Sequence, residues 1–289
     1  REEKIKFRKK GNVWELTEPV KDRANQEMVG EILGWTQMLQ REETFRNPDK
    51  KELKRFGVAK PKLRLKFFGP GAPPELWFGK ETAVEGRDYL RVKDADEVFV
   101  VNNALRNVIT RKVDEFRDPR LTDLEARYVT RLAIRTGAGE IELEKDAGHW
   151  RLTKPLKARA HDEVVEELIG TLVGLPVLGF EAAKGENLNR FGLGEPAETI
   201  RLWKVDEEKP VTLAVGREVE TPGADAAASL EPSAPSGTET PDGSPATPKE
   251  SSPDAAPEKP RRYARISSRD VVCILPPAIS RMLALRPNE

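Results

Sequence analysis

The sequence predicts an α+β protein of two homologous domains, each a mostly antiparallel β-sheet packed by two helices. One segment occurs twice: residues 11–19 read GNVWELTEP, and residues 148–155 read GHWRLTKP. Trp14 recurs as Trp150, at an offset of 150 − 14 = 136 residues. An echo at this distance indicates a duplicated domain, because solenoid repeats are only ~20–50 residues long. The 289 residues suffice for two domains that each bury a core.

Each copy opens with a predicted hairpin, at residues 4–8 with 13–17 and at residues 140–144 with 149–153. Apolar and charged residues alternate in these segments, which is typical of strands with one face in water. Pro19 ends the second strand of the first hairpin, since proline cannot donate to a strand ladder. Pro155 does the same in the second copy.

A helix is predicted after each hairpin, because apolar residues recur in pairs four positions apart. The matching stripes are Met28, Val29, Ile32 and Leu33 in the first copy and Val164, Val165, Leu168 and Ile169 in the second. The remaining elements expected in the first copy are strands at 63–68, 75–79, 89–93 and 97–101 and a helix at 104–116. The second copy has an additional strand at 128–136. The first copy lacks room for its counterpart, and from this we expect a trimmed N-terminus.

The domain limits follow from these offsets: residues 1–119 form the first repeat, 120–127 a connector and 128–289 the second repeat. Gly79 recurs as Gly216 at an offset of 137, and Tyr89 recurs as Tyr263 at an offset of 174. The difference, 174 − 137 = 37 residues, is an insertion in the second repeat at about 221–260. It is rich in Pro, Ala, Ser and acidic residues and lacks aromatic residues, a composition that predicts disorder. Two interpretations stay open, a partner-recruiting tether and a tolerated insertion without a role.

Composition excludes several classes of protein. Lys and Arg number 49 and Asp and Glu also number 49, so no net field draws the molecule to nucleic acid. No run approaches the ~18 apolar residues of a membrane span. The single cysteine, Cys273, excludes an internal disulfide framework and a thiolate zinc site. It lies in an apolar segment, where we expect a small buried side chain.

A search for catalytic chemistry finds no convincing site, so we expect no catalytic residues, no cofactor and no metal. The two histidines, His149 and His161, lack the spacing of a zinc motif. The glycine pairs at 137–139 and 192–194 lack the further glycine or lysine of a nucleotide-binding loop, and we interpret them as turns. Carboxylate pairs such as Asp94 with Asp96 and Asp22 with Glu27 are interpreted as surface charge.

Two further motifs are interpreted as structural, the repeated tryptophan and an Arg–Asp segment. Trp14 and Trp150 are expected in the core on the apolar hairpin faces, with stacking on sugars as the alternative. Arg117 and Asp118 follow the predicted helix just before Pro119, where an Arg–Asp pair would fix the exit to the next domain.

Taken together, these motifs resemble the bacterial domain of unknown function 4340, in two tandem copies. The residues that carry the resemblance are Trp14, Pro19, Gly57, Pro61, Gly79, Phe116, Arg117, Asp118, Trp150, Pro155, Gly192, Pro196 and Gly216. Asn25 and His161 depart from it, because an aspartate helix cap is usual there. The resemblance implies an N-terminal membrane anchor, an extracytoplasmic (periplasmic) location, and an association with ABC-type transport systems, including gliding-type ones. It brings no known catalytic residues.

We therefore expect a non-enzymatic, membrane-tethered accessory or interaction module of a transport complex, with a transporter permease or an ATP-binding subunit as partner. No nucleic-acid partner is expected. The alternative is a binding protein that holds a small ligand or a cell-wall polymer in the groove between the repeats. A carboxylate-based hydrolase is the third and weakest hypothesis.

Overall fold

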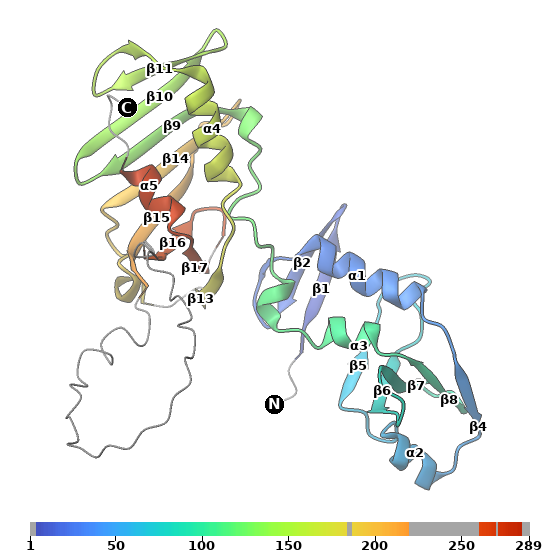
Figure 1. The fold of residues 1–289 in the computed structure, drawn as a ribbon. Helices are drawn as coiled ribbons and strands as arrows, with labels where there is room; N and C mark the ends of the chain where they lie inside the picture. Colours follow the sequence, from blue (N-terminus) through green and yellow to red (C-terminus); the bar gives the residue numbers. More distant parts are fainter. Residues whose placement is uncertain (1–3, 184–186, 220–259, 270, 285–289) are drawn as a thin grey trace, which may run out of the picture. The chain divides into compact units, whose positions relative to one another are not determined.

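The structure is a computed structural model that divides into two compact units, each described here by itself (Figure 1). The first unit is Arg1–Asp118 and the second unit is Pro119–Glu289. The predicted disordered insertion at 221–260 lies outside the described residues except for Pro260. Both units combine antiparallel sheets with short helices, which confirms the predicted α+β class. The described residues are 4–183, 187–219, 260–269 and 271–284.

A single antiparallel sheet organises the described part of the second unit. The strand order is β12-β11-β10-β9-β14-β15-β16-β17-β13. Strand β9 joins its two halves, because it pairs with β10 on one side and with β14 on the other. The strands are β9 (Val129–Thr136), β10 (Gly139–Asp146), β11 (His149–Lys154), β12 (Ala158–Arg159), β13 (Gly179–Ala183), β14 (Glu198–Lys204), β15 (Val211–Glu218), β16 (Arg262–Ile266) and β17 (Val271–Leu275).

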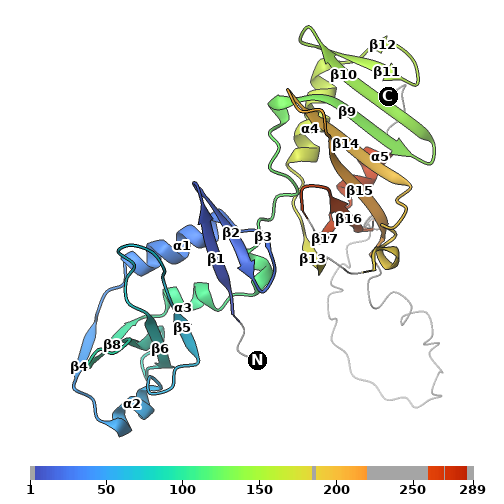
Figure 2. The same cartoon turned by 180° about the vertical axis from the view of Figure 1, so that it is seen from behind.

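Two helices, α4 (Asp162–Val173) and α5 (Ala278–Leu283), cover one face of this sheet (Figures 1 and 2). Their apolar stripes meet strand residues such as Leu132 and Trp150 in one large core. Short 3₁₀ helices lie at η2 (Ala126–Tyr128) and η3 (Leu188–Phe191). We call the face opposite α4 and α5 the outer face.

In the first unit the described strands form two sheets instead of one. The orders are β1-β2-β3 and β4-β8-β7-β6-β5, again antiparallel throughout. The strands are β1 (Lys6–Lys10), β2 (Val13–Glu18), β3 (Asp22–Arg23), β4 (Glu43–Arg46), β5 (Leu63–Leu65), β6 (Leu76–Glu81), β7 (Arg87–Val92) and β8 (Glu97–Asn102).

Capping residues explain where helices α1 and α2 of the first unit begin and where α2 ends. Asn25 caps α1 (Gln26–Gln37) by accepting hydrogen bonds from two backbone N–H groups of the first turn. Asp49 and Glu52 form a capping box at the start of α2 (Lys50–Phe56), and Gly57 ends that helix in the left-handed conformation. A third helix, α3 (Ala104–Ile109), precedes a 3₁₀ turn, η1 (Val113–Phe116).

The hairpins of the two units match residue by residue. Lys9 pairs with Trp14 in β1–β2, and Lys145 pairs with Trp150 in β10–β11, at the offset of 136. Both hairpins carry a register shift at the same place. The order β5-β6-β7-β8-β4 likewise repeats β14-β15-β16-β17-β13. Among the described residues the first unit has no counterpart of β9, and for that reason its sheet is split.

Several predicted boundaries were wrong. The helix expected at 104–116 stops at Ile109 and resumes only as η1. Its break follows Val108 and Ile109 and includes Thr110, three β-branched residues in a row that lower helix propensity. The strand expected at 63–68 ends at Leu65, and the strand expected at 128–136 begins at Val129 because Tyr128 belongs to η2. Strands β4 and β13 were not predicted.

None of the helices in the described ranges combines the length and the apolarity needed to cross a membrane.

Candidate functional site

The outer face of the second unit carries a connected group of charged side chains. Strand alternation puts Glu140 and Glu142 of β10 on this face, beside Lys154 of β11. The neighbouring strands contribute Arg131 from β9 and Arg201 from β14. The group therefore depends on the pairing of four strands.

These five side chains bind one another. The Lys154 Nζ lies 2.8 Å from a carboxylate oxygen of Glu142 and 3.2 Å from one of Glu140. Arg131 forms an ion pair with Glu142, and Arg201 forms one with Glu140. We call these five residues the outer-face network.

The contacts within the network shift the pKa values of Glu142 and Lys154. Burial raises the pKa of Glu142, but the hydrogen bonds from Lys154 and Arg131 outweigh it, so the pKa of this carboxyl lies below its ordinary value. Hydrogen bonds to Glu142 and Glu140 raise the pKa of the Lys154 ammonium. Both shifts favour the charged forms, of the Glu142 carboxylate and of the Lys154 ammonium.

Trp203 lies beside the network at the end of β14. The guanidinium of Arg131 stacks on its ring at 4.5 Å from the centroid, and that of Arg201 lies at 5.3 Å. An open hollow of about 630 Å³ adjoins these side chains. It is lined by Thr130, Arg131, Glu144, Lys145, Trp203, Lys204, Asp206, Glu207 and Glu208.

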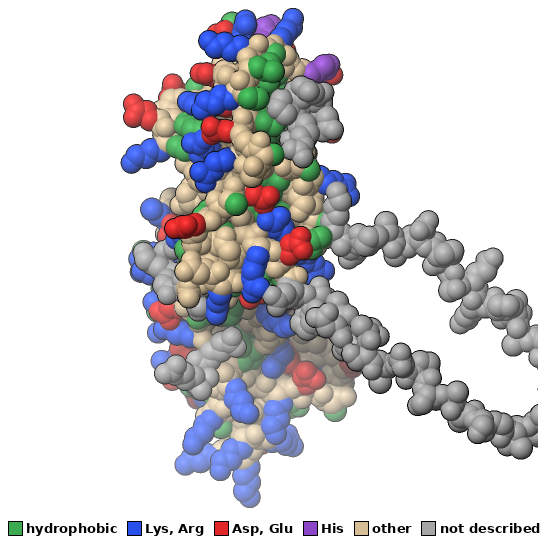
Figure 3. All heavy atoms as spheres, turned by 90° about the vertical axis from the view of Figure 1, so that its left-hand side faces the viewer, with side chains coloured by type: hydrophobic (Ala, Val, Ile, Leu, Met, Phe, Trp, Pro, Cys, Tyr) green, Lys and Arg blue, Asp and Glu red, His purple; other side chains and the backbone are tan. Residues whose placement is uncertain are grey.

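Basic and acidic side chains are mixed on the face of the second unit that Figure 3 shows. In Figure 3 the blue Lys and Arg side chains in the upper part of the picture are interspersed with red Asp and Glu side chains. A surface of mixed charge of this kind favours contacts with another protein over attraction of a polyanion.

The candidate histidines have different surroundings. His149 Nδ1 lies 2.8 Å from Asp162, whose other oxygen accepts the backbone N–H of Trp150 at 2.6 Å. The hydrogen bond from His149 lowers the pKa of Asp162. His161 stands at the N-cap of α4 and makes no side-chain cap hydrogen bond. In the described part of the chain, no three His, Cys, Asp or Glu side chains are grouped as a metal site.

Cys273 is buried in β17, where its thiol donates to the carbonyl of Ala264 at 3.4 Å. The sequence had indicated a small buried side chain here. Asp94, Asp96 and Glu27 are exposed, as expected of surface charge. The same interpretation was wrong for Asp22, whose side chain is 4% exposed and forms an ion pair with Arg117.

The two motif tryptophans differ in burial. Trp150 is 1% exposed and belongs to the main core, whereas Trp14 is half-buried and contacts a smaller cluster. In the first unit Gln26 takes the role of Asp162, because its side chain accepts from the Trp14 N–H at 2.8 Å.

The motif glycines hold a strand against a turn. A Cβ on Gly79 would lie 2.3 Å from the carbonyl oxygen of Phe56, and a Cβ on Gly216 would lie 2.1 Å from that of Phe191. Only glycine allows this approach. The turn residues themselves, Gly57 and Gly192, have φ of +79° and +71°.

At each of these two glycines, an arginine donates a hydrogen bond to the glycine carbonyl oxygen. Arg106 of α3 donates to the Gly79 carbonyl at 2.5 Å and pairs with the buried Asp88 at 2.6 Å. Burial raises the pKa of Asp88, although the hydrogen bond from Arg106 opposes this. In the second unit Arg262 donates to the Gly216 carbonyl at 2.8 Å.

The motif prolines follow the hairpin strands directly. Pro19 comes after β2, Pro155 comes after β11, and both follow cis peptide bonds. Pro61 and Pro196 lie half-buried between the glycine turns and strands β5 and β14, and Pro196 accepts a hydrogen bond from Arg135 at 3.3 Å.

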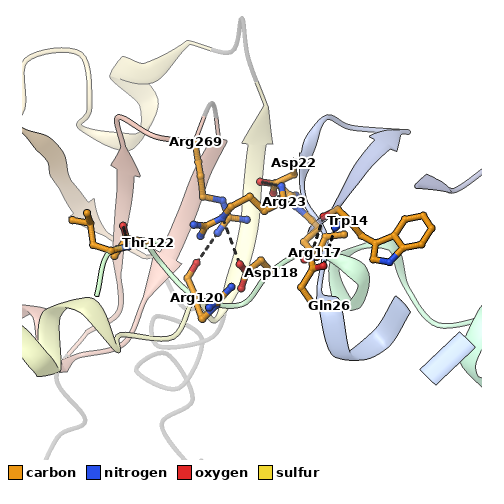
Figure 4. Close-up of polar contacts among 11 residues, drawn as sticks. Trp14, Asp22, Arg23, Gln26, Arg117, Asp118, Arg120, Thr122 and Arg269 are labelled. Carbon is orange, nitrogen blue, oxygen red and sulfur yellow. Dashed lines mark hydrogen bonds and ion pairs between the residues drawn. The ribbon is translucent and has the colours of Figure 1, made fainter. Parts of the chain in front are cut away.

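The segment Phe116 to Asp118 closes the first unit. Arg117 Nε lies 2.8 Å from Asp22, and Arg23 Nε lies 3.5 Å from Asp118 (Figure 4). Arg117 and Asp118 are buried, and the Phe116 carbonyl accepts from Asn25 at 2.8 Å. The motif therefore ties the end of the unit to the start of α1. Within the second unit, Arg269 donates to the Arg120 carbonyl at 2.9 Å.

Comparison with known proteins identifies the family. The profile of the domain of unknown function DUF4340 matches residues 14–149 and 150–224. The chain belongs to this family. It holds two tandem DUF4340 copies, whose matches begin at residue 14 and at Trp150. No curated protein and no solved structure matches the chain.

The DUF4340 motifs were visible in the sequence, whereas the outer-face network was not singled out. A signal for it exists in the segment EIELE at residues 140–144 and in the alternating arginines of β9. Alternation placed these charges on one face of their strands, but only the strand order brings them together.

Proposed function

We propose that this DUF4340 chain is a non-enzymatic, protein-binding accessory module of a transport complex. The observation that carries the proposal is the outer face of the second unit. Its charged side chains bind one another in a network beside Trp203, and the adjoining hollow is open. Surfaces with a tryptophan, arginines and a charged surround are typical of protein interfaces.

The proposed cellular location and the proposed partner come from the family resemblance. It favours a position at the extracytoplasmic face of the membrane, with an N-terminal anchor, and a permease or an ATP-binding subunit of an ABC-type transporter as partner. An interaction module needs a rigid support for its contact surface, and a nine-stranded sheet backed by two helices supplies one.

A specific observation also supports a second function. The open hollow beside Trp203 has a tryptophan and several charged side chains, which also suits the edge of a sugar polymer or a polar ligand. A binding protein for a small ligand or a cell-wall polymer is therefore the competing proposal.

Co-purification from membranes separates the two. The tagged chain is incubated with detergent-solubilised membranes of its source, and bound proteins are identified by mass spectrometry. We expect a transporter permease or ATP-binding subunit in stoichiometric amount. Retention of a cell-wall polymer, without any transporter subunit, would replace the proposal by its competitor.

Two variants test the surface itself. Trp203→Ala removes the ring that Arg131 and Arg201 stack on, and we expect it to reduce co-purification of the subunit at least about tenfold, as interface tryptophans often do. Val164→Ala is the control, because Val164 is 54% exposed on α4, on the other side of the sheet. If both variants bind like the parent, the outer face is not the contact surface.

A further inference from the structure

The charged side chains that line the hollow beside Trp203 differ in whether they form ion pairs. All three lining cations do so: Lys145 with a carboxylate of α4 at 2.8 Å, Lys204 with one of its own turn at 3.0 Å, and Arg131 within the outer-face network. Among the residues that the structure describes, three lining carboxylates form no ion pair, namely Glu144, Asp206 and Glu208.

The strand register explains the surroundings of Glu144. In the sheet it lies directly across from Arg131 of β9 and from Arg151 of β11. Arg131 pairs with the buried Glu142 instead, and Arg151 pairs with Asp146 at 3.3 Å. Both strand neighbours of Glu144 are therefore engaged elsewhere, and its carboxylate can accept a cation from outside.

The other two carboxylates lie in the turn after β14. Asp206 has φ of +63°, a left-handed conformation that aspartate adopts more readily than most residues. Asp206 and Glu208 are exposed, whereas Glu207 between them pairs with Lys204. The hydrogen bond to Glu207 raises the pKa of Lys204, a shift that favours the charged form of this pair's ammonium. The turn thus adds negative charge to the hollow from a second element.

The spacing of these carboxylates does not fit a shared metal ion. A bound Ca²⁺ or Mg²⁺ needs several oxygen ligands at about 2.0–2.6 Å from one point. In the described ranges, no three His, Cys, Asp or Glu side chains are grouped closely enough to hold a metal. Separate carboxylates instead suit separate cations, such as the Lys and Arg side chains of an extended segment, each of which can meet one carboxylate.

Apolar side chains border the same hollow. Trp203 lines it, and Val205, which stands between two lining residues, is 42% exposed. The backbone N–H of Val205 donates to the carbonyl of Tyr128 at 2.8 Å, and Tyr128 is 40% exposed. Exposed aromatic and aliphatic side chains beside charged ones are typical of a contact surface for another protein, whereas a small polyamine would use only the carboxylates.

We propose that this hollow is the docking site for an extended basic segment of the partner protein, in which Lys or Arg residues are interspersed with apolar ones. Its cations pair with Glu144, Asp206 and Glu208, and its apolar side chains contact Trp203 and Val205. Charge complementarity of this kind selects the partner and speeds its association. The inference rests on the proposed function, since it names the chemistry of the segment by which the partner is bound.

The probe is a fluorescently labelled peptide, RLRLRLR, whose binding to the full chain is measured by anisotropy. We expect saturable binding that weakens as salt is added, because salt screens exposed charges. The double variant Glu144→Lys with Glu208→Lys should weaken binding at least about tenfold, because two attractive pairs become repulsive. The same variant should gain binding to the acidic peptide ELELELE.

Two controls make the result specific to the hollow. Glu163→Lys with Glu167→Lys changes the net charge equally at exposed positions of α4, on the other face of the sheet, and should leave binding unchanged. The peptide GKGKGKG keeps cations but lacks apolar side chains, so it should bind at least about tenfold more weakly. Circular dichroism should show parent-like folding of both double variants, because all four positions are exposed.

Absence of saturable binding, or binding that the Glu144 and Glu208 double variant leaves unchanged, would overturn the inference. Equal binding of GKGKGKG and RLRLRLR would overturn it in favour of a simple polycation such as spermidine. Failure of the proposed function is distinguishable, because the peptide would then bind while membranes yield no transporter subunit.

Discussion

The two units share a topology but close their sheets differently. In the second unit β9 joins the hairpin β10–β11 to β14 and makes one sheet, whereas in the first unit the equivalent strands belong to two sheets. The core and the glycine turns persist in both units despite this. Among the described residues, β9 is the strand that makes the sheet of the second unit continuous.

The hairpins differ in the sign of their charges but keep the pairing. Lys6 faces Glu18 across the first hairpin, and Glu142 faces Lys154 across the second, at identical register. Opposite charges across a strand pair stabilise it whichever strand carries which sign. Complementarity has therefore been retained between the copies where residue identity has not.

The largest difference between the units is expected at the motif tryptophans. Trp150→Ala should destabilise the second unit by about 3–5 kcal/mol, because it empties a fully buried site. Trp14→Ala should cost clearly less, since Trp14 is half-buried. Denaturant unfolding followed by circular dichroism measures both. A Trp150→Ala protein of normal stability that no longer binds a sugar polymer would contradict the core role.

The motif glycines should behave alike in both units. Gly79→Ala and Gly216→Ala should each cost about 1–3 kcal/mol, because the new Cβ would overlap a carbonyl oxygen. Gly30→Ala in α1 is the matched control; no atom lies near its Cβ position, and we expect a gain of about 0.5–1 kcal/mol. Thermal unfolding of the three variants gives the comparison, and equal effects at all three positions would contradict it.

A smaller effect is expected from the outer-face network on acidification. The pKa of Glu142 is lowered in the folded protein, so its contribution to stability is present above the ordinary value of 4.5 and is lost as pH falls through the folded value. Glu142→Gln should therefore flatten the loss of stability below about pH 4.5. Urea unfolding between pH 3 and 7 tests this, with the exposed Glu144→Gln as control. An unchanged slope in Glu142→Gln would rule out this role.

The smallest difference between the units is expected at two aromatic residues. Trp203 lies near the end of β14, and Phe68 follows β5. Phe68→Ser should change stability by no more than about 0.5 kcal/mol, because the ring is exposed. Trp203→Ser should cost about 1 kcal/mol through its lost contacts with two arginines. The two variants are compared by their denaturation midpoints. A larger cost at Phe68 would mean that this ring already packs on the first unit.

Local patterns in the sequence predicted the local structure well. The alternation of the hairpins, the apolar stripe of α1, and the turns at Gly57 and Gly192 all depend on neighbours within a few residues. In α4 the predicted stripe was wrong at Val164, which is 54% exposed, whereas Val165 and Ile169 are buried. The short strands β4 and β13 were missed because each is stabilised by a distant partner, β8 or β17. The division of the first sheet was also missed, and among the described residues no strand of the first unit takes the place of β9.

The candidate site shows the same limit. Glu142 and Arg131 are typical surface residues by sequence, and only the pairing of β9 with β10 brings them into contact. Arg117 and Asp118 were expected to contribute an Arg–Asp pair before Pro119, but Arg117 pairs with Asp22, which is 95 residues away in the sequence, and Asp118 pairs with Arg23. Composition and spacing therefore indicated which residues matter near a turn, and missed those that meet across a sheet.

The glycine carbonyls have a consequence for how the copies diverged. Gly79 and Gly216 each leave one backbone acceptor that an arginine satisfies, yet the arginine comes from α3 in one unit and from β16 in the other. At the offset of 174, Arg262 corresponds to Asp88 and Ser280 corresponds to Arg106. The two copies thus share the acceptor but not the position of its donor. A residue-by-residue comparison of the copies at Asp88 and Arg106 therefore finds different side chains, although the glycine carbonyl receives an arginine hydrogen bond in both.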